Sequence, residues 1–184
     1  MAETAPLIAV FASDRGPGDP ERASMMSQAG SHFAKRGARL ICLADNGYVP
    51  VPLITAARTA GGAVQVIADG TITLPKALDG VPLEVLDTAQ ERLARIGNLA
   101  TAYVALPGSL SSVTALFNSW AAANAQGRVL PVVMLNRHKA YDVIRGFGND
   151  VMSHQFSAYE KSLQFADSVE DTWNRLQRVL PARG

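Results

Sequence analysis

A short segment in the second half of the chain combines residue types that bind anions. Residues 107–112 have the sequence PGSLSS and lead from an apolar run into a helical pattern. Glycine permits a tight turn and a close backbone approach, and a helix start with free N–H groups favours phosphate. In the alternative interpretation, Ser111 or Ser112 only caps the helix. The candidate ligand-binding residues of this segment are Gly108, Ser109, Ser111 and Ser112.

Polar side chains also follow two other apolar runs. Ser13 and Asp14 come after residues 7–11, and Asp45 comes after residues 39–43. If both runs are parallel strands, these side chains face the edge of the sheet where ligands bind. Ser13 and Asp14 are candidate ligand contacts, and Asp45 is a candidate catalytic carboxylate. Aspartate is also a common turn and capping residue, which is the alternative for both carboxylates.

Arg92 is the candidate catalytic cation. It lies on the first turn of a predicted helix and is able to clamp a phosphate with two hydrogen bonds. The alternative is a surface ion pair. Residues 88–91 (TAQE) fit a capping box, so that Glu91 is explained by the helix start rather than by catalysis. The residues to inspect after strands are Asp14, Arg15, Asp45, Asn46, Asp69, Asp87, residues 108–112 and residues 136–138.

Strand-like and helical patterns alternate along the chain. Strands are predicted at 7–11, 39–43, 63–67, 81–86, 102–106 and 130–135, the last being the final central strand. Helices are predicted after Asp19-Pro20, at 53–60, from Thr88, at about 112–126 and from Ser168. This alternation predicts an α/β fold, a Rossmann-like three-layer sandwich with a mainly parallel central sheet. The absence of a repeat or linker predicts a single domain over residues 1–184.

Composition excludes several classes of function. The 184 residues carry a net charge of +1, which gives no electrostatic footprint for nucleic acid or an acidic membrane. No apolar run approaches the ~20 residues of a membrane span, and residues 1–6 lack the basic start of a signal peptide. Cys42 has no partner cysteine, and the three histidines lack metal-ligand spacing. We expect a cytoplasmic protein without metal, cofactor, nucleic-acid partner or membrane partner.

Residues 91–120 resemble the signature region of the Lonely Guy (LOG) family, cytokinin-activating phosphoribohydrolases long mislabelled as lysine decarboxylases. The family pattern joins E-R-K on a helix to A-L-P-G-G-x-G-T-x-x-E and then to L-F-x-x-W. The matching residues are Glu91, Arg92, Ala105, Leu106, Pro107, Gly108, Leu116, Phe117 and Trp120. The resemblance extends through residues 131–136, Tyr141 and Asp142, and it reaches back to residues 10–11 and to the helix that ends at residues 36–37. The resemblance implies release of base and ribose 5-phosphate from a nucleoside 5′-monophosphate, and a homodimer.

The chain departs from this pattern where the family's chemistry lies. Serines replace two glycines and the threonine of the glycine-rich motif, and the family's second glycine motif falls on the unrelated residues 43–51. The active-site glutamate of the family corresponds to Ala115, and the lysine after Arg92 corresponds to Leu93. Loss of a general acid or base typically costs about 10²–10⁴ in rate. The departures therefore predict a weak enzyme or a protein without this activity.

Three functions remain open from the sequence. The leading hypothesis is a LOG-like protein that binds a small phosphorylated ligand and has lost most or all hydrolase activity. The second keeps the hydrolysis, with Asp45 or Asp14 replacing the missing glutamate. The third is a non-catalytic partner subunit of a hetero-oligomer. Tyr48, within the degenerate glycine motif, either stacks on a base or fills the space left by the glycines.

Overall fold

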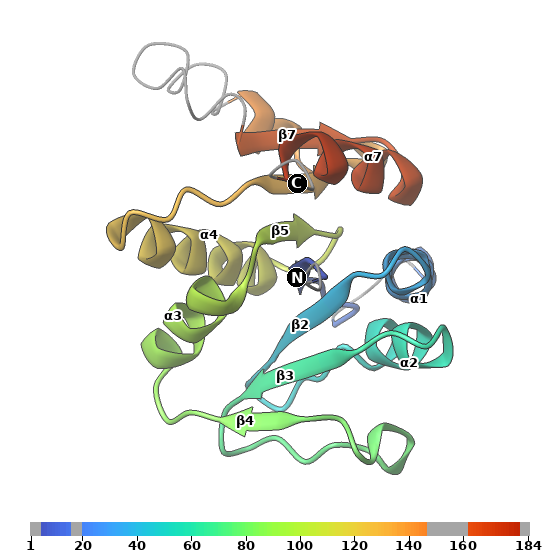
Figure 1. Ribbon diagram of the computed structural model, residues 1–184, viewed down its shortest axis with the longest axis vertical. Helices are drawn as coiled ribbons and strands as arrows, with labels where there is room; N and C mark the ends of the chain where they lie inside the picture. Colours follow the sequence, from blue (N-terminus) through green and yellow to red (C-terminus); the bar gives the residue numbers. More distant parts are fainter. Residues whose placement is uncertain (1–4, 16–19, 147–161, 181–184) are drawn as a thin grey trace.

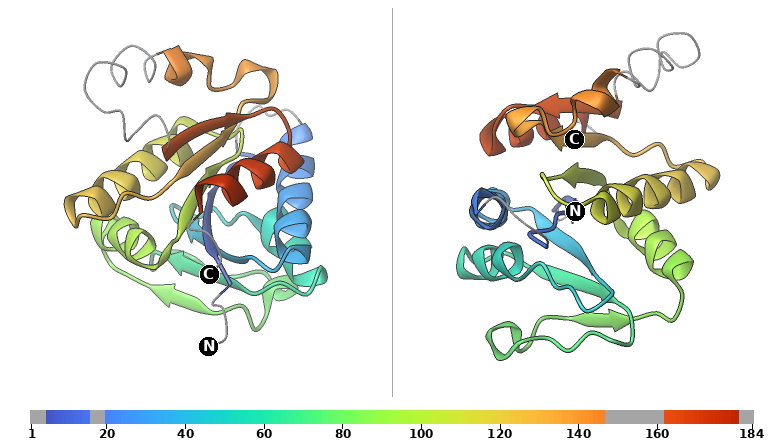
Figure 2. Two further views of the ribbon diagram at one scale, coloured as in Figure 1. Left: turned by 45° about the horizontal axis from the view of Figure 1, so that its top comes forward. Right: turned by 180° about the vertical axis from the view of Figure 1, so that it is seen from behind.

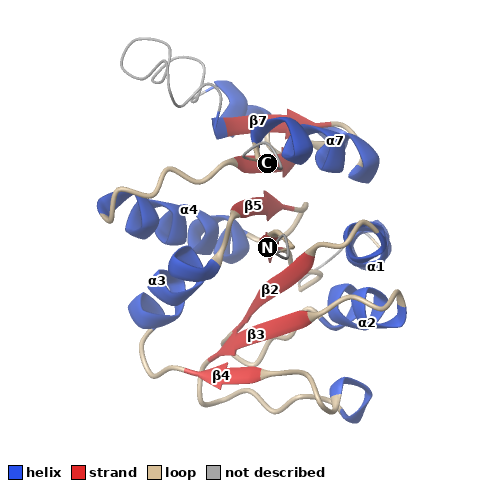
Figure 3. Cartoon of the chain, in the orientation of Figure 1, coloured by secondary structure: helices blue, strands red, loops and turns tan. Residues whose placement is uncertain are grey.

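One parallel sheet runs through the structure, a computed structural model that describes residues 5–15, 20–146 and 162–180. Its seven strands lie in the order β4-β3-β2-β1-β5-β6-β7, and every strand pair is parallel (Figures 1 and 3). The strands are β1 (Leu7–Phe11), β2 (Arg39–Ala44), β3 (Val64–Ala68), β4 (Leu83–Val85), β5 (Ala102–Ala105), β6 (Val132–Leu135) and β7 (Leu163–Ala166). The predicted α/β architecture is confirmed.

Helices cover both faces of the sheet. One face carries α1 (Glu21–Lys35), α2 (Val51–Thr59) and α7 (Val169–Val179), and the other carries α3 (Ala89–Leu99) and α4 (Leu110–Ala125), as Figures 1 and 2 show. Short 3₁₀ turns occupy Lys76–Leu78 and Arg137–Lys139. Within the described ranges, no helix has the length and apolar character needed to cross a membrane.

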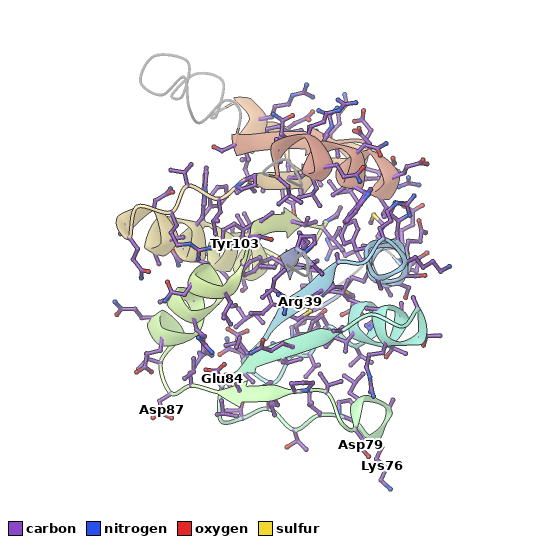
Figure 4. All side chains as sticks on the ribbon, viewed as in Figure 1. Arg39, Lys76, Asp79, Glu84, Asp87 and Tyr103 are labelled. Carbon is purple, nitrogen blue, oxygen red and sulfur yellow. The ribbon has the colours of Figure 1, made fainter. Side chains whose placement is uncertain are left out.

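The core is divided by the sheet because strand side chains alternate between its faces. Ile8 and Val10 pack with the α1 and α2 side, whereas Phe11 packs with the α3 and α4 side. On the second side Tyr103 is fully buried, and its hydroxyl pairs with Ser119 Oγ of α4 at 3.1 Å. Figure 4 shows Tyr103 between β5 and these helices. The helices are therefore fixed against the central strands that position the candidate site.

Several element boundaries differ from the prediction. Helix α2 begins at Val51 and includes Pro52, which the first turn tolerates because its N–H would have no intrahelical partner. Pro20 takes the N-cap position of α1, and Asp19 lies outside the described residues. Strand β7 was not predicted; residues 147–161, just before it, lie outside the described residues.

The strand order reverses between β1 and β5. From this point the chain builds the sheet outward through β2, β3 and β4 on one side and through β6 and β7 on the other. In open α/β sheets, ligands bind outside the carboxyl ends of the strands at such a switch point. The loops after β1 and β5 are therefore the first place to look for a site.

Candidate functional site

A cavity of about 290 Å³ lies at the switch point. It is lined by the loops after β1 and β2 and by the first turns of α4. Five of the candidate ligand-binding or catalytic residues meet there: Ser13, Asp45, Ser109, Ser111 and Ser112. Arg15, Asn46, Tyr48 and Ala115 also line it. Loops that are far apart in sequence thus form one polar cavity.

A tight turn after β2 shapes one wall of the cavity. Asn46 and Gly47 both have positive φ angles, 51° and 71°, and the Tyr48 N–H donates to the Asp45 carbonyl at 2.9 Å. These features are typical of a type I′ turn, for which Asn-Gly is the preferred pair. The tight turn was not predicted from the sequence. The turn sets Asp45 and Tyr48 opposite each other on the cavity wall.

Tyr48 joins the loops after β1 and β2. Its hydroxyl accepts a hydrogen bond from the Asp14 N–H at 3.2 Å and donates to Met26 Sδ at 3.9 Å. The Arg15 guanidinium lies 5.6 Å from the centre of its ring. Burial raises the pKa of Tyr48 to about 12, so the hydroxyl stays protonated. Asp14 contributes its backbone to this contact and is not among the residues that line the cavity.

Gly108 lets the loops after β1 and β5 touch. A Cβ atom at this position would lie 2.9 Å from Ser13 N and 2.6 Å from Ser112 Oγ, closer than real Cβ atoms approach. Only glycine therefore fits without a shift of the backbone. Gly108 does not line the cavity, but it fixes the start of α4 beside the Ser13 loop.

The serines of residues 107–112 divide into two roles. Ser109 is the N-cap of α4: its Oγ accepts from Ser112 N at 3.2 Å, and Ser112 Oγ accepts from Ser109 N at 3.1 Å. The interpretation that Ser111 or Ser112 caps the helix is therefore wrong, and α4 begins at Leu110 rather than near Ser112. Ser111 is exposed. Its N–H and that of Leu110 have no intrahelical acceptor in the first turn.

Arg92 is buried beneath the edge of the site rather than paired on the surface. Its side chain is 6% exposed, and Nη1 donates to the carbonyls of Leu86 at 2.8 Å and Asp87 at 3.1 Å. Among the described residues, its buried Nε has no hydrogen-bond partner. The surface ion pair considered from the sequence is therefore wrong. Arg92 does not line the cavity, but its charge acts on Asp45.

Two aspartates after neighbouring strands have opposite environments. Burial raises the pKa of Asp45, and nearby Asp69 raises it further, whereas Arg92 opposes the shift. Asp69 accepts from Thr71 Oγ1 at 2.5 Å, from Thr71 N at 2.8 Å and from Asn46 N at 2.8 Å. These bonds, that from the Thr71 hydroxyl first, lower the pKa of Asp69. Asp45 is thus the carboxyl group better suited to exchange a proton.

Arg15 and Asp69 were residues to inspect after strands and had no role assigned from the sequence. Both follow a strand closely, which was the available signal, but their contacts with Asn46 join segments separated by 31 and 23 residues. Such contacts depend on strand order. In the part of the chain that the structure describes, no group of three His, Cys, Asp or Glu side chains is arranged to hold a metal ion.

Comparison with known proteins gives one curated relative and several solved structures. No protein-family model matches the chain. The cytokinin riboside 5′-monophosphate phosphoribohydrolase of Mycobacterium tuberculosis is 26% identical over 169 residues, 89% of each chain. The resemblance to the LOG family is thereby confirmed.

The solved structures agree on the fold. The molybdenum cofactor carrier protein of Chlamydomonas reinhardtii matches with a TM-score of 0.70 at 17% identity, over 95% of this chain and 98% of the other. The molybdenum cofactor binding protein of the phototrophic bacterium Rippkaea orientalis matches with a TM-score of 0.68 at 18% identity, over 95% and 97%. These similarities confirm the Rossmann-like architecture.

Proposed function

We propose that this protein binds a nucleoside 5′-monophosphate, or a related phosphosugar, in the cavity between the loops after β1, β2 and β5. We further propose that its phosphoribohydrolase activity is weak or lost. The protein would act as a single domain over residues 1–184 and as a homodimer, the assembly that the LOG resemblance implies. The observation that carries the proposal is the cavity itself, which opens beside the start of α4.

The start of α4 supports the binding part of the proposal. Its N–H groups at Leu110 and Ser111 are free for an acceptor, and no acidic residue lies in its first turn. Both features favour an anion at this helix end. The named substrate of the M. tuberculosis relative carries a 5′-monophosphate. The neighbours named for the molybdenum cofactor are less than 25% identical and support the fold alone.

Ala115 supports the loss of activity. It lines the cavity at the position where the family pattern has its active-site glutamate. A methyl group neither orients a water molecule nor stabilises positive charge on a ribose. Arg92, the arginine of the E-R-K pattern, has Nη1 bound to two backbone carbonyls. The cavity thus keeps polar groups for binding and lacks the carboxylate in its expected place.

Hydrolysis through Asp45 is the second candidate. Asp45 lines the same cavity, and its raised pKa brings it nearer to the range of a general acid or base. In this reaction water attacks the anomeric carbon, the C–N bond breaks, and the base leaves protonated from ribose 5-phosphate. Asp45 would take one proton from the attacking water molecule, and this proton then passes to the leaving base.

Two measurements on the purified protein separate these candidates. Calorimetric titration with AMP, GMP, CMP, UMP and ribose 5-phosphate tests binding, and chromatographic detection of free base tests hydrolysis. Binding without base release supports the leading proposal. Base release that Arg92→Ala and Asp45→Asn abolish, but Asp14→Asn does not, supports hydrolysis through Asp45. A protein that binds none of these compounds contradicts both.

A further inference from the structure

The cavity contains one cationic side chain. Among its described lining residues, Arg15 alone is a lysine, arginine or histidine. Arg92 lies outside the lining, with Nη1 bound to the carbonyls of Leu86 and Asp87. Among the described lining residues, Arg15 is therefore the cationic side chain that an anion in the cavity can contact. This position was not assigned a role from the sequence.

The turn after β2 holds Arg15 in the lining of the cavity. Its Nη2 donates to the Asn46 carbonyl at 2.9 Å, and its guanidinium lies over the ring of Tyr48. The Arg15 N–H donates to Ser13 Oγ at 3.2 Å, which fixes the backbone from which the side chain extends. Among the described residues, no other acceptor binds the guanidinium, so its remaining N–H groups are available to a ligand.

The same cavity presents groups of opposite charge. Arg15 is near enough to Asp45 to oppose the rise in the carboxyl pKa that burial causes. Gly108 holds the α4 start against the loop after β1, and Ser109, Ser111 and Arg15 line the same space. A ligand with a dianionic group at one end and hydroxyl groups at the other matches this arrangement, because carboxylates accept hydrogen bonds from sugar hydroxyls.

We propose that Arg15 binds the phosphate group of the ligand and so selects phosphorylated over unphosphorylated compounds. Tyr48 is a positioning residue in this proposal, because its ring holds the guanidinium in place. The inference rests on the proposed function and names the side chain that determines its specificity. Arginine suits this role since its planar group donates two parallel hydrogen bonds to a phosphate.

The test is the ratio of dissociation constants for adenosine and AMP, measured by calorimetry on the wild-type protein and on Arg15→Ala. We expect AMP to bind about 10- to 100-fold more weakly to Arg15→Ala, while the affinity for adenosine changes less than about twofold. Arg15→Lys should lie between the two, because it keeps the charge without the planar donor pair. The affinity for ribose 5-phosphate should change across these variants as the affinity for AMP does.

Arg145→Ala is the matched control. Arg145 is also exposed, and its guanidinium also lies over an aromatic ring, that of Phe165 at 5.8 Å, but it does not line the cavity. Its removal should leave the ratio unchanged. Tyr48→Phe keeps the ring and should retain most of the preference for AMP over adenosine. Tyr48→Leu removes the ring and should lose part of this preference.

The outcomes distinguish this inference from the proposed function. If the wild-type protein binds AMP and Arg15→Ala binds it equally well, the role of Arg15 is refuted and the proposed function stands. Equal weakening of AMP and adenosine also refutes it, since Arg15 would then shape the cavity without recognising phosphate. If the wild-type protein binds no phosphorylated compound, both proposals fail. Circular dichroism melting of each variant excludes unfolding as the cause.

Discussion

Helices α3 and α4 begin in the same way and differ in charge. Thr88 caps α3 and Glu91 closes its capping box, whereas Ser109 caps α4 and Ser112 closes the box there. In each case the cap side chain accepts from the backbone N–H three residues ahead, and the backbone N–H of the cap residue donates to the side chain at that position. The hydrogen bonds from Thr88 lower the pKa of Glu91, so α3 carries a negative charge at its start. The start of α4 has none.

The two helix starts also lie at different places in the sheet. Helix α3 follows β4, the edge strand, whereas α4 follows β5, next to the switch point. The comparison teaches that capping geometry by itself does not distinguish a structural helix start from a ligand site. The charge at the third helical position and the place of the preceding strand make that distinction.

Gly108→Ala should have the largest effect, because it pushes the start of α4 away from the Ser13 loop. The added methyl group would lie 2.9 Å from Ser13 N, and overpacking of this kind costs about 1–3 kcal/mol. We expect a lower midpoint of urea unfolding and a loss of AMP binding. Gly70→Ala is the control, since its Cβ meets nothing within 4 Å and its φ is not positive. Equal stability of the two variants would contradict the close approach.

Ser112→Glu gives α4 the charge that α3 already has. The glutamate can close the capping box, so the melting temperature should stay the same or rise slightly. AMP should bind about 10-fold more weakly or worse, because a carboxylate then occupies the place of the anion. Ser112→Gln has the same shape without the charge and should bind more tightly than Ser112→Glu. Identical affinities of the two variants would argue against an anion at this helix end.

Removal of either cap tests whether the two capping boxes contribute equally to the stability of the protein. Thr88→Ala and Ser109→Ala should each cost about 1 kcal/mol, because each leaves a helix N–H without its side-chain acceptor. Urea unfolding of both variants measures this cost. Calorimetry should then show weaker AMP binding for Ser109→Ala and unchanged binding for Thr88→Ala. Weaker binding in both variants would mean that the α3 start also contributes to the site.

Asp45 and Asp69 extend the comparison to the pH dependence of stability, where we expect the smallest effect. The raised pKa of Asp45 means that the folded protein loses stability as the pH rises from about 4, the unfolded value, through the folded value. Asp45→Asn should therefore melt at a higher temperature than wild type at pH 7 and at the same temperature near pH 3.

The lowered pKa of Asp69 gives the opposite sign. Its ionised form stabilises the fold above the unfolded pKa, and this contribution is lost as the pH falls through the folded value. Asp69→Asn should melt at a lower temperature than wild type at pH 7, with a difference that shrinks in acid. Melting curves of Asp45→Asn and Asp69→Asn from pH 3 to 8 check both predictions. A shift of the same sign in both would contradict their opposite environments.

Much of the fold follows from the sequence because its signals are short-range. Apolar runs and caps predicted six of the seven strands and the capped starts of α3 and α7. Strand β7 gave too weak a pattern, since two of its four residues are only partly buried. The boundary at Val51 was missed because Pro52 suggested a loop rather than a first helical turn.

The candidate site was predicted only in part. The segment PGSLSS marked the right helix start, but nothing in it shows that Ser109 and Ser112 use their hydroxyl groups on each other. Arg92 was expected at the ligand, yet its burial and its bonds to Leu86 and Asp87 depend on how α3 packs beside the end of β4. Its role in catalysis, like that of Asp45, stays a prediction.

The sequence by itself determined the alternation of strands and helices, the capping box at Thr88 and the alanine at position 115. Each of these depends on a few neighbouring residues. Only the tertiary structure decided that Arg15 lies against Asn46 and Tyr48 and that Asp69 binds the same turn. The physical reason is that these contacts join the ends of different strands. Strand order and register, set by packing of the whole sheet, bring those ends together.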